Sequence, residues 1–448
     1  MTVYLLERAW VDGAARDDVL VTVEDGRFTA VTWAGTTAQS IDQATDRAAE
    51  PADVVRVPGL TIPGLANAHS HAFHRALRGR TQRGSGTFWT WREQMYSLAE
   101  RLDPDSYYAL ARAVYREMAA TGITCVGEFH YLHHGPDGTP YDDPNAMGLA
   151  LVEAAREAGI RIALLDTCYL SSGFGQPPEG VQRRYSDGDA TRWGERVAAI
   201  APRPGVVVGA AVHSVRAVPR DQLGTVVAAA QGRPLHVHLS EQVAENDACQ
   251  AAYGLTPTGL LADAGVLGPL TSAVHATHLT DQDIALLGGS QTYACFCPTT
   301  ERDLADGIGP SVALREAGSA LTLGSDSHAV VDLFEEMRAV ELNERLATQR
   351  RGHWTAAQLI EAGTTTGQAS LGFPDAGRIA PGHRADLVTV DTATLRTAGT
   401  GADEHTAVFA ATAADVTQVM VDGRVVVRQG EAADIGRELV DVIGRLQQ

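Results

Sequence analysis

His69 and His71 are separated by one residue and follow the apolar run 60–66. Side chains two apart in a β-strand point to the same face, so both imidazoles would face the same way from a strand end. This is typical of two ligands of one metal ion, although a chance pair in a loop has the same spacing. Three further apolar runs each lead to a possible metal ligand or proton carrier: His238, His275 and Asp326.

Three neutral imidazoles and one carboxylate around a divalent ion leave a position for water, as in catalytic sites, where the metal supplies a hydroxide nucleophile. Glu241 lies three residues after His238, at the expected start of a helix, where it could act as a general base. The alternative is an acid favoured by the helix dipole. His275 could polarise the substrate or orient the hydroxide. His278 competes for that role, but His275 is closer to the strand end.

All 36 basic residues are arginine, and lysine is absent. This excludes a Walker A lysine, a pyridoxal-phosphate Schiff base and a carbamylated lysine between two metals, so we expect a mononuclear site. The five cysteines are odd in number and lie mostly in apolar runs, which indicates buried reduced thiols rather than disulfides or a zinc knuckle.

The middle of the chain, residues 59–381, alternates strand-like runs with helical segments such as 153–159, 217–230 and 256–264. This pattern predicts a (β/α)8 TIM barrel, whose carboxyl strand ends converge on one mouth. A doubly wound open sheet is the alternative, but no G-x-G-x-x-G follows the first strand. Eight runs are the expected strands: 60–67, 121–129, 161–168, 206–212, 235–239, 272–276, 292–296 and 321–324.

Both ends of the chain are rich in short β-type runs separated by Gly and Asp turns. Asp25-Gly26 and Asp422-Gly423 each lie between two such runs, which is a strong hairpin signal. We therefore expect one small β-sandwich domain built from both termini, residues 1–58 and 382–448.

Composition restricts the partners. With 44% hydrophobic and 20% charged residues, the 448-residue chain is typical of a soluble globular protein. Its net charge of −19 argues against nucleic acid and anionic membranes. No apolar run is long enough for a membrane span, and the N-terminus is interpreted as a first strand rather than a signal peptide, hence a cytoplasmic protein. We expect a homodimer that acts on a small molecule with carboxylates.

Several stretches resemble motifs of the amidohydrolase superfamily. Residues 63–71 are similar to its first-strand motif, and the H-x-x-E form of 238–241, without lysine, resembles the mononuclear deaminase branch. Three other stretches are similar to its sixth and eighth strands and to its return into the small domain: 274–278, 324–328 and 377–387. The resemblance implies that four residues hold the metal: His69, His71, His238 and Asp326.

Within that branch the chain resembles the formimidoylglutamate deiminases over nearly its whole length, most clearly at 69–76, 87–96, 127–134 and 213–216. The resemblance implies hydrolysis of N-formimino-L-glutamate to N-formyl-L-glutamate and ammonia in histidine degradation, with one Zn²⁺ or with Fe²⁺. It implies catalytic roles for Glu241, His275 and Asp326. It also implies five substrate-binding residues: His74, Arg92, Tyr131, His213 and Arg216. His74 is a departure, because Gln is usual there.

A substrate with two carboxylates would be repelled by this acidic chain unless arginines converge locally. Arg92 and Arg216 suit that task because a planar guanidinium binds a carboxylate through two hydrogen bonds, although both could be surface or structural residues. Trp89 and Trp91 are interpreted as packing residues. A second hypothesis keeps the chemistry but takes an aminated purine, pyrimidine or triazine, held by aromatic stacking. A third is a catalytically inactive binding protein, which would usually have lost metal ligands.

Overall fold

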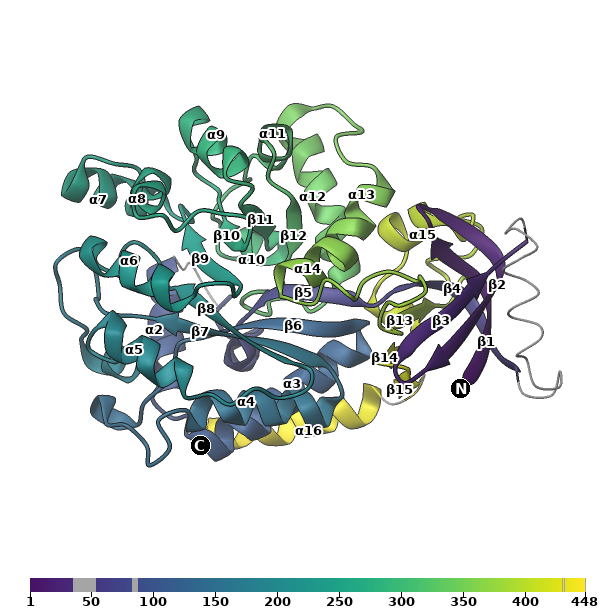
Figure 1. Cartoon of the computed structure of the whole chain (residues 1–448), viewed down its shortest axis with the longest axis horizontal. Helices are drawn as coiled ribbons and strands as arrows, with labels where there is room; N and C mark the ends of the chain where they lie inside the picture. Colours follow the sequence, from purple (N-terminus) through teal and green to yellow (C-terminus); the bar gives the residue numbers. More distant parts are fainter. Residues whose placement is uncertain (35–53, 83–87, 429, 431, 448) are drawn as a thin grey trace.

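A barrel of eight parallel strands forms the centre of the computed structural model, which describes residues 1–34, 54–82, 88–428, 430 and 432–447 (Figure 1). Consecutive strands are neighbours throughout, as expected for a (β/α)8 barrel. The predicted fold class is therefore confirmed. The strands are β5 (Leu65–Ser70), β6 (Ile123–His130), β7 (Arg161–Cys168), β8 (Val206–Val212), β9 (Leu235–Leu239), β10 (Thr271–His275), β11 (Tyr293–Phe296) and β12 (Leu321–Leu323).

Helices follow the strands and surround the barrel (Figure 1). Of the three helical segments predicted above, 153–159 covers the end of α4, while 217–230 and 256–264 contain the whole of α6 and α8. The larger helices of this layer are α3 (Pro104–Ala120), α4 (Ala146–Ala158), α5 (Ala190–Ala198), α6 (Arg220–Ala229), α7 (Val243–Tyr253), α8 (Pro257–Asp263), α9 (Asp281–Gly289), α11 (Ser311–Ala317) and α12 (Leu333–Thr348). The helix α2 (Phe88–Ala99) precedes α3 and lies over the barrel mouth together with the loops that follow the strands.

The first and last barrel strands meet just beyond β12. Ser70 and Asp326 form an isolated parallel bridge, and the Asp326 backbone N–H donates to the His69 carbonyl over 3.0 Å. Gly324 permits this approach, because a Cβ there would lie 2.7 Å from the His69 carbonyl oxygen. The meeting point therefore places Asp326 beside the two histidines of the first barrel strand.

Strands from both termini form a separate seven-stranded sheet, in the order β15-β14-β13-β4-β1-β2-β3. Its hairpin turns at Asp25-Gly26 (φ 48° and 78°) and Asp422-Gly423 (φ 46° and 72°) have the positive φ pairs that two-residue turns require. Both hairpin predictions are confirmed. The strands are β1 (Thr2–Val11), β2 (Ala14–Glu24), β3 (Arg27–Thr32), β4 (Val54–Pro63), β13 (Leu387–Val390), β14 (Val416–Val421) and β15 (Arg424–Arg428).

The expected single strand over residues 60–67 is wrong. The chain is divided at Gly64: residues up to Pro63 belong to β4 of the terminal sheet, and β5 of the barrel begins at Leu65. A Cβ at position 64 would lie 2.4 Å from the Thr124 hydroxyl, so only glycine fits this crossing. Because β5 continues to Ser70, His69 lies within the strand rather than after it.

The last helix, α16 (Ala432–Leu446), packs against α3 of the barrel and not against the terminal sheet (Figure 1). Glu438 accepts hydrogen bonds from Arg112, with Nε at 3.0 Å, and from Arg116. The C-terminal segment therefore contributes to both parts of the molecule.

Buried charge joins the barrel to the terminal sheet. The Arg161 guanidinium on β7 donates two hydrogen bonds to the Asp386 carboxylate, one of them over 3.0 Å, and both side chains are almost fully buried. Replacing Arg161 by methionine should lower the free energy of unfolding by about 3–5 kcal/mol, since Asp386 would stay buried without a counter-charge. Urea denaturation measures this. Arg156→Met, which removes only surface ion pairs with Glu153 and Glu157, is the control and should change little; equal effects would contradict the prediction.

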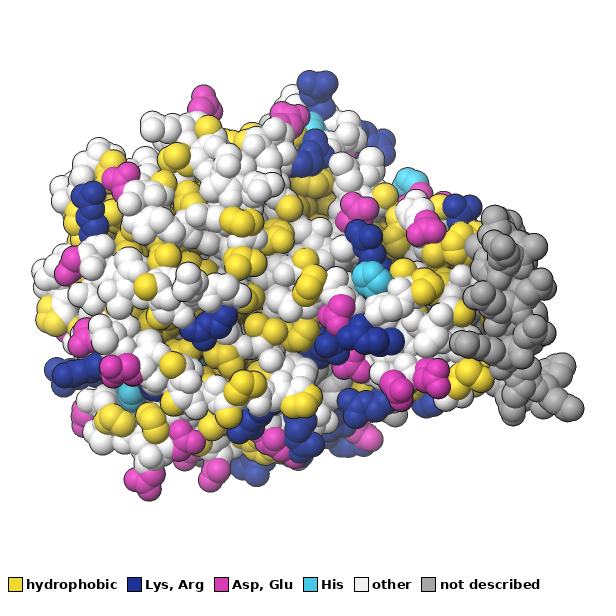
Figure 2. Space-filling view, in the orientation of Figure 1, with side chains coloured by type: hydrophobic (Ala, Val, Ile, Leu, Met, Phe, Trp, Pro, Cys, Tyr) yellow, Lys and Arg dark blue, Asp and Glu magenta, His cyan; other side chains and the backbone are white. Residues whose placement is uncertain are grey.

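All five cysteines are buried and free, as predicted. No helix in the described part of the chain is long and apolar enough to cross a membrane. On the face seen in Figure 2, arginine and acidic side chains are interspersed among polar and apolar ones.

Candidate metal centre and substrate cavity

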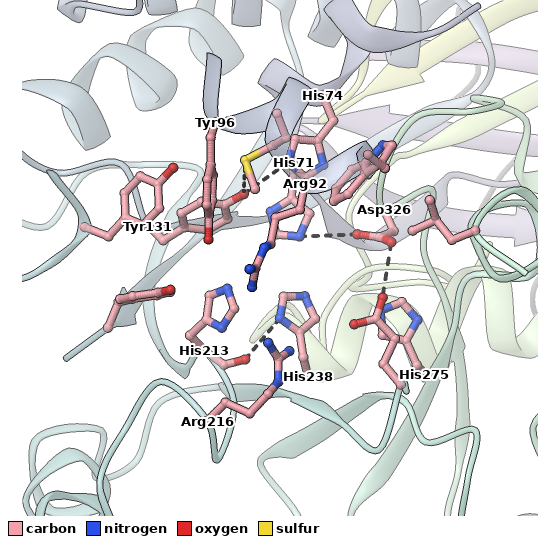
Figure 3. Close-up of a pocket in the computed structure, with 16 residues that line it drawn as sticks. His71, His74, Arg92, Tyr96, Tyr131, His213, Arg216, His238, His275 and Asp326 are labelled. Carbon is pink, nitrogen blue, oxygen red and sulfur yellow. Dashed lines mark hydrogen bonds and ion pairs between the residues drawn. The ribbon is translucent and has the colours of Figure 1, made fainter. Parts of the chain in front are cut away.

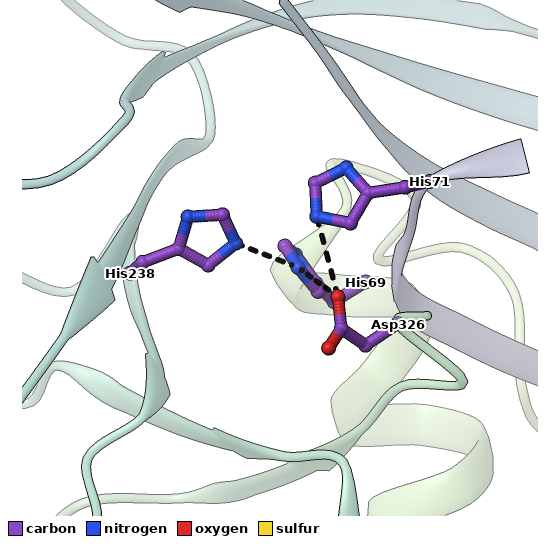
Figure 4. Close-up of side chains that lie close together, drawn as sticks. All are labelled: His69, His71, His238 and Asp326. Atoms are coloured by element: carbon purple, nitrogen blue, oxygen red, sulfur yellow. Dashed lines mark hydrogen bonds and ion pairs between the residues drawn. The ribbon is translucent and has the colours of Figure 1, made fainter. Parts of the chain in front are cut away.

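Four predicted ligands converge from three separate strand ends (Figure 4). His69 and His71 come from the end of β5, His238 from β9, and Asp326 from the segment after β12. One ligand atom from each lies within 4.8 Å of all the others, and all four residues are buried. Spacing and strand-end placement in the sequence thus correctly predicted which side chains, far apart along the chain, lie close together in the fold.

Backbone carbonyls determine which ring nitrogens carry protons. Nδ1 of His71 lies 3.0 Å from the Phe129 carbonyl oxygen, and Nδ1 of His238 lies 3.0 Å from the His213 carbonyl oxygen. A carbonyl only accepts, so each Nδ1 is the donor and each Nε2 presents a lone pair. Such carbonyl contacts are typical of histidines that bind metal through the other nitrogen.

The lone pairs point at one another. His71 Nε2 is 3.2 Å from Asp326 Oδ1, and His238 Nε2 is 3.1 Å from His69 Nε2. In a neutral His71 with its proton on Nδ1, Nε2 and the facing Asp326 oxygen are both acceptors, and they repel unless a cation lies between them. Three imidazole nitrogens and one carboxylate oxygen are also a preferred donor set for a divalent transition metal. The residues present therefore fit a metal ion.

The surroundings of these side chains keep the imidazoles neutral and the carboxyl group ionised, which are the protonation states that bind a metal ion. Burial lowers the pKa of His69 to about 4 and that of His238 well below its usual value, so both rings are neutral near pH 7. Burial alone would raise the pKa of Asp326, but the neighbouring imidazoles of His69 and His71 hold that pKa well below its usual value. The carboxylate is therefore ionised.

Glu241 and His275 lie beside the four ligands. His275 Nε2 is 3.8 Å from Glu241 Oε1 and 3.9 Å from Asp326 Oδ2. On its other side, His275 Nδ1 is 3.4 Å from Glu301 Oε1, a contact that spacing in the sequence did not predict. Although burial opposes protonation, the carboxylates of Glu241, Glu301 and Asp326 raise the pKa of His275 well above its usual value. Burial raises the pKa of Glu241.

Unusual backbone geometry marks the same strand ends. Positive φ angles occur at Ser240 (50°), His275 (69°) and Asp326 (39°), none of them glycine. Each such residue costs on the order of 1–3 kcal/mol and persists where the surroundings enforce it, as at many active sites. The barrel therefore holds these side chains in directions that relaxed strands would not give.

A cavity opens beside the four ligands, at the carboxyl ends of the strands (Figure 3). All five predicted substrate-binding residues line it, together with Glu241, His275 and three of the four metal ligands. His74 lies on the short helix η2 (Ala72–Leu77), where its Nε2 is 3.0 Å from the Tyr131 hydroxyl. The ring of His213 lies 5.2 Å from that of His238 between centroids.

Arg92 and Arg216 extend their guanidinium groups into this cavity from α2 and from the loop after β8 (Figure 3). The guanidinium carbon of Arg92 lies 5.5 Å from the centre of the Tyr96 ring. Nε of Arg216 lies 3.6 Å from Oε2 of Glu245, a buried acid on α7. Burial raises the pKa of Glu245 to about 7, although Arg216 acts in the opposite direction. Two positive groups thus face one end of the cavity.

Several lining residues were not predicted. Trp91 packs against the hydrophobic core, as interpreted above, and it also lines the cavity. The side chain of Trp89 lies outside the described part of the structure. Tyrosines dominate the remaining wall: Tyr96, Tyr169 and Tyr185. None of them lies at a spacing that distinguishes it from a core aromatic, so the sequence carried no signal for them.

A second group of possible ligands, His130, His133 and Asp166, lies away from this cavity. Both oxygens of Asp166 accept from the Arg196 guanidinium, at 2.8 and 2.9 Å, and Oδ1 also accepts from the Trp193 indole. Because these donors occupy the carboxylate, we interpret the group as a buried ion-pair network.

Comparison with known proteins agrees with this geometry. The model of the amidohydrolase family matches residues 60–426. The chain belongs to the amidohydrolase family. A formimidoylglutamate deiminase from Pseudomonas aeruginosa is 37% identical over 410 residues, 87% of this chain and 90% of its own length. An 8-oxoguanine deaminase from the same species is 29% identical over 447 residues, 94% of this chain and 92% of its own. The crystal structure of an amidohydrolase from Brucella melitensis has a TM-score of 0.89 and 29% identity, with both chains fully covered.

Membership of this family makes the protein a hydrolase that acts on C–N bonds. The cluster of three histidines and one aspartate at the barrel mouth is a group that could hold a metal ion.

Proposed function

We propose that the protein hydrolyses N-formimino-L-glutamate to N-formyl-L-glutamate and ammonia, a reaction of histidine degradation. The observation that carries the proposal is the convergence of Arg92 and Arg216 on a cavity that ends at the metal-binding group. A dicarboxylate whose reactive C=N group lies at its other end matches both features. The 37% identity to a formimidoylglutamate deiminase supports the same substrate.

One Zn²⁺ ion, held by His69, His71, His238 and Asp326, is the cofactor that we propose; Fe²⁺ accepts the same ligands. When bound, such an ion lowers the pKa of a water molecule and makes it a nucleophile near neutral pH. Because no lysine is present, these four residues would hold a single ion rather than a bridged pair.

Glu241 is the proposed proton carrier. Its carboxylate would carry both protons of the attacking water, one after the other, to the terminal formimino nitrogen. The C–N bond to this nitrogen then breaks, the nitrogen leaves as ammonia and the carbon becomes the formyl group. His275, positively charged and 3.8 Å from Glu241, would orient that carboxylate and stabilise negative charge that develops in the transition state. Asp326 would assist by holding the charged His275 ring in place, since its second oxygen lies 3.9 Å from His275 Nε2.

The substrate carboxylates would be bound by Arg92 and Arg216, with hydrogen bonds from His74, Tyr131 and His213. Burial and the nearby Arg216 lower the pKa of His213 well below its usual value, so His213 binds as a neutral ring. Glu245 lies 3.6 Å from Arg216 Nε and would restrain the guanidinium before the substrate arrives.

A deaminase of an aminated heterocycle is the second candidate. The aromatic side chains of Trp91, Tyr96 and Tyr169 that line the cavity favour it, since they could stack on a ring. The 29% identity to an 8-oxoguanine deaminase points the same way. This candidate does not explain why two arginines converge on the cavity, because an aminated heterocycle has no carboxylate for them to bind.

Ammonia release from N-formimino-L-glutamate tests the proposal directly. The purified protein is loaded with Zn²⁺, incubated with this substrate or with 8-oxoguanine or adenosine, and ammonia is measured together with the mass of the product. We expect release from N-formimino-L-glutamate alone and its loss in protein stripped with a chelator. Release only from a heterocycle would replace the first candidate by the second. A cytoplasmic location and a homodimer stay predictions.

A further inference from the structure

Gln182 lies behind the tyrosine wall of the cavity, on the short helix η4 (Gly180–Tyr185). Its amide nitrogen donates one hydrogen bond to the Tyr96 hydroxyl and one to the Tyr169 hydroxyl, both over 2.9 Å. Both tyrosines line the cavity, whereas Gln182 is 5% exposed and does not. One buried amide thus connects two walls, α2 and the end of β7.

The orientation of this amide is fixed by the backbone. Its oxygen accepts from the Glu179 N–H over 3.0 Å, so the amide nitrogen must be the atom that faces the tyrosines. Arg184 in the same helix holds the segment in place. Its guanidinium donates to the carbonyls of Ala99, the last residue of the helix that carries Tyr96, and of Leu102, three residues further on. The two N–H donors therefore meet the hydroxyls in a pre-organised geometry.

Counting the protons available shows in which direction each of the two tyrosine hydroxyls can donate a hydrogen bond. Each accepts from Gln182, so each must direct its own proton elsewhere. Among the described residues no other hydrogen bond is made by either hydroxyl. At least one O–H therefore remains to donate into the cavity.

The place where that proton points is positive. Tyr169 is influenced by the charges of both Arg92 and Arg216, and the Arg92 guanidinium carbon lies 5.5 Å from the centre of the Tyr96 ring (Figure 3). Guanidinium groups and tyrosine O–H groups that face one space form a surface of donors. Such a surface suits a carboxylate, which only accepts.

We propose that Gln182 is a positioning residue that sets the Tyr96 and Tyr169 hydroxyls as donors to one substrate carboxylate, the one held between Arg92 and Arg216. The dicarboxylate substrate is taken from the function proposed above. Gln182 touches no substrate itself. It acts because an amide that donates to a hydroxyl oxygen obliges the hydroxyl proton to turn toward the ligand.

Gln182→Glu reverses this polarity with almost no change of shape. One oxygen of the new carboxylate keeps the Glu179 N–H, while the other accepts from the tyrosines, so their protons turn away and lone pairs face the ligand. We expect N-formyl-L-glutamate to bind at least tenfold more weakly, since a hydrogen bond to a charged group is replaced by repulsion. Gln182→Met, which neither donates nor accepts, should cause a smaller loss.

Calorimetric titration of the zinc-loaded protein with N-formyl-L-glutamate and its two monoamides, N-formyl-L-glutamine and N-formyl-L-isoglutamine, measures the effect. The loss of affinity caused by Gln182→Glu should be about tenfold smaller for the monoamide that lacks the carboxylate held between Arg92 and Arg216. An equal loss for all three ligands would indicate general damage and overturn the proposal. So would binding of N-formyl-L-glutamate as tight as in the wild type.

Two further measurements keep the result decisive. If Gln182→Glu does not fold, as judged by thermal unfolding, Tyr96→Phe combined with Tyr169→Phe replaces it, and only a loss selective for the dicarboxylate supports the proposal. Turnover of N-formimino-L-glutamate by the wild type is measured separately. If the wild type binds N-formyl-L-glutamate but does not turn over N-formimino-L-glutamate, the proposed function is refuted. The role of Gln182 is then still decided by comparing the affinity losses of Gln182→Glu for the dicarboxylate and the monoamides. Absence of both overturns both.

Discussion

Replacing Glu241 by glutamine is expected to lower kcat about a thousandfold while the protein keeps its metal. General acid–base catalysis by one positioned side chain is worth roughly 10²–10⁴ in rate, and an amide neither accepts nor delivers a proton. Glu241 is buried, 3.8 Å from His275, and is not one of the four clustered ligands. Initial rates of ammonia release and elemental analysis of the same samples separate loss of proton transfer from loss of metal.

The pH dependence of the wild type gives an independent check. Burial raises the pKa of Glu241, and a general base must be ionised to act. We therefore expect kcat to fall as the pH falls through this raised pKa, and the acid limb to disappear in the residual activity of Glu241→Gln. Glu195→Gln, on the exposed face of α5, is the matched control and should keep wild-type rates. A Glu241→Gln variant within tenfold of the wild-type kcat would remove Glu241 from the mechanism.

The barrel and its metal ligands could be predicted because they obey short-range rules. Strand periodicity and the tendency of parallel strands to carry chemistry at their carboxyl ends place His238, His275 and Asp326 at one mouth. The error at residues 60–67 has the same origin. An apolar run predicts that a segment is extended and buried, but it does not predict which of two sheets each half of the segment joins. Only the close packing at Gly64 separates β4 from β5.

The substrate end of the cavity was predicted less completely, and the reason is physical. Tyr96, Tyr169 and Gln182 come from the helix α2, the end of β7 and the short helix η4, and only the folded barrel brings them together. Their types are also common in cores, so no spacing distinguishes a donor wall from ordinary packing. Glu245 is similar: an acid in the first turn of a helix has an ordinary explanation in the helix dipole until Arg216 is seen opposite it.

Replacing Arg216 by methionine is expected to raise KM for N-formimino-L-glutamate about a hundredfold, with a smaller change in kcat. Charge-assisted hydrogen bonds contribute about 1.5–3 kcal/mol each, and tenfold in KM corresponds to about 1.4 kcal/mol. Arg216 also offsets the net charge of −19, which would otherwise repel a dianion. Methionine keeps most of the side-chain volume, so the cavity wall should persist. Steady-state kinetics over a wide substrate range measures the effect.

The removal of Arg216 also leaves Glu245 buried without its partner, and this second effect must be separated from lost substrate binding. The double variant Arg216→Met with Glu245→Gln restores neutrality behind the cavity wall, so it should regain thermal stability but not affinity. Arg220→Met, at the exposed start of the next helix, is the control for loss of one positive charge. If KM for the dicarboxylate stayed unaltered in both Arg216 variants, the arginine would be structural. The aromatic wall would then define the site, which is the geometry that a heterocycle deaminase requires.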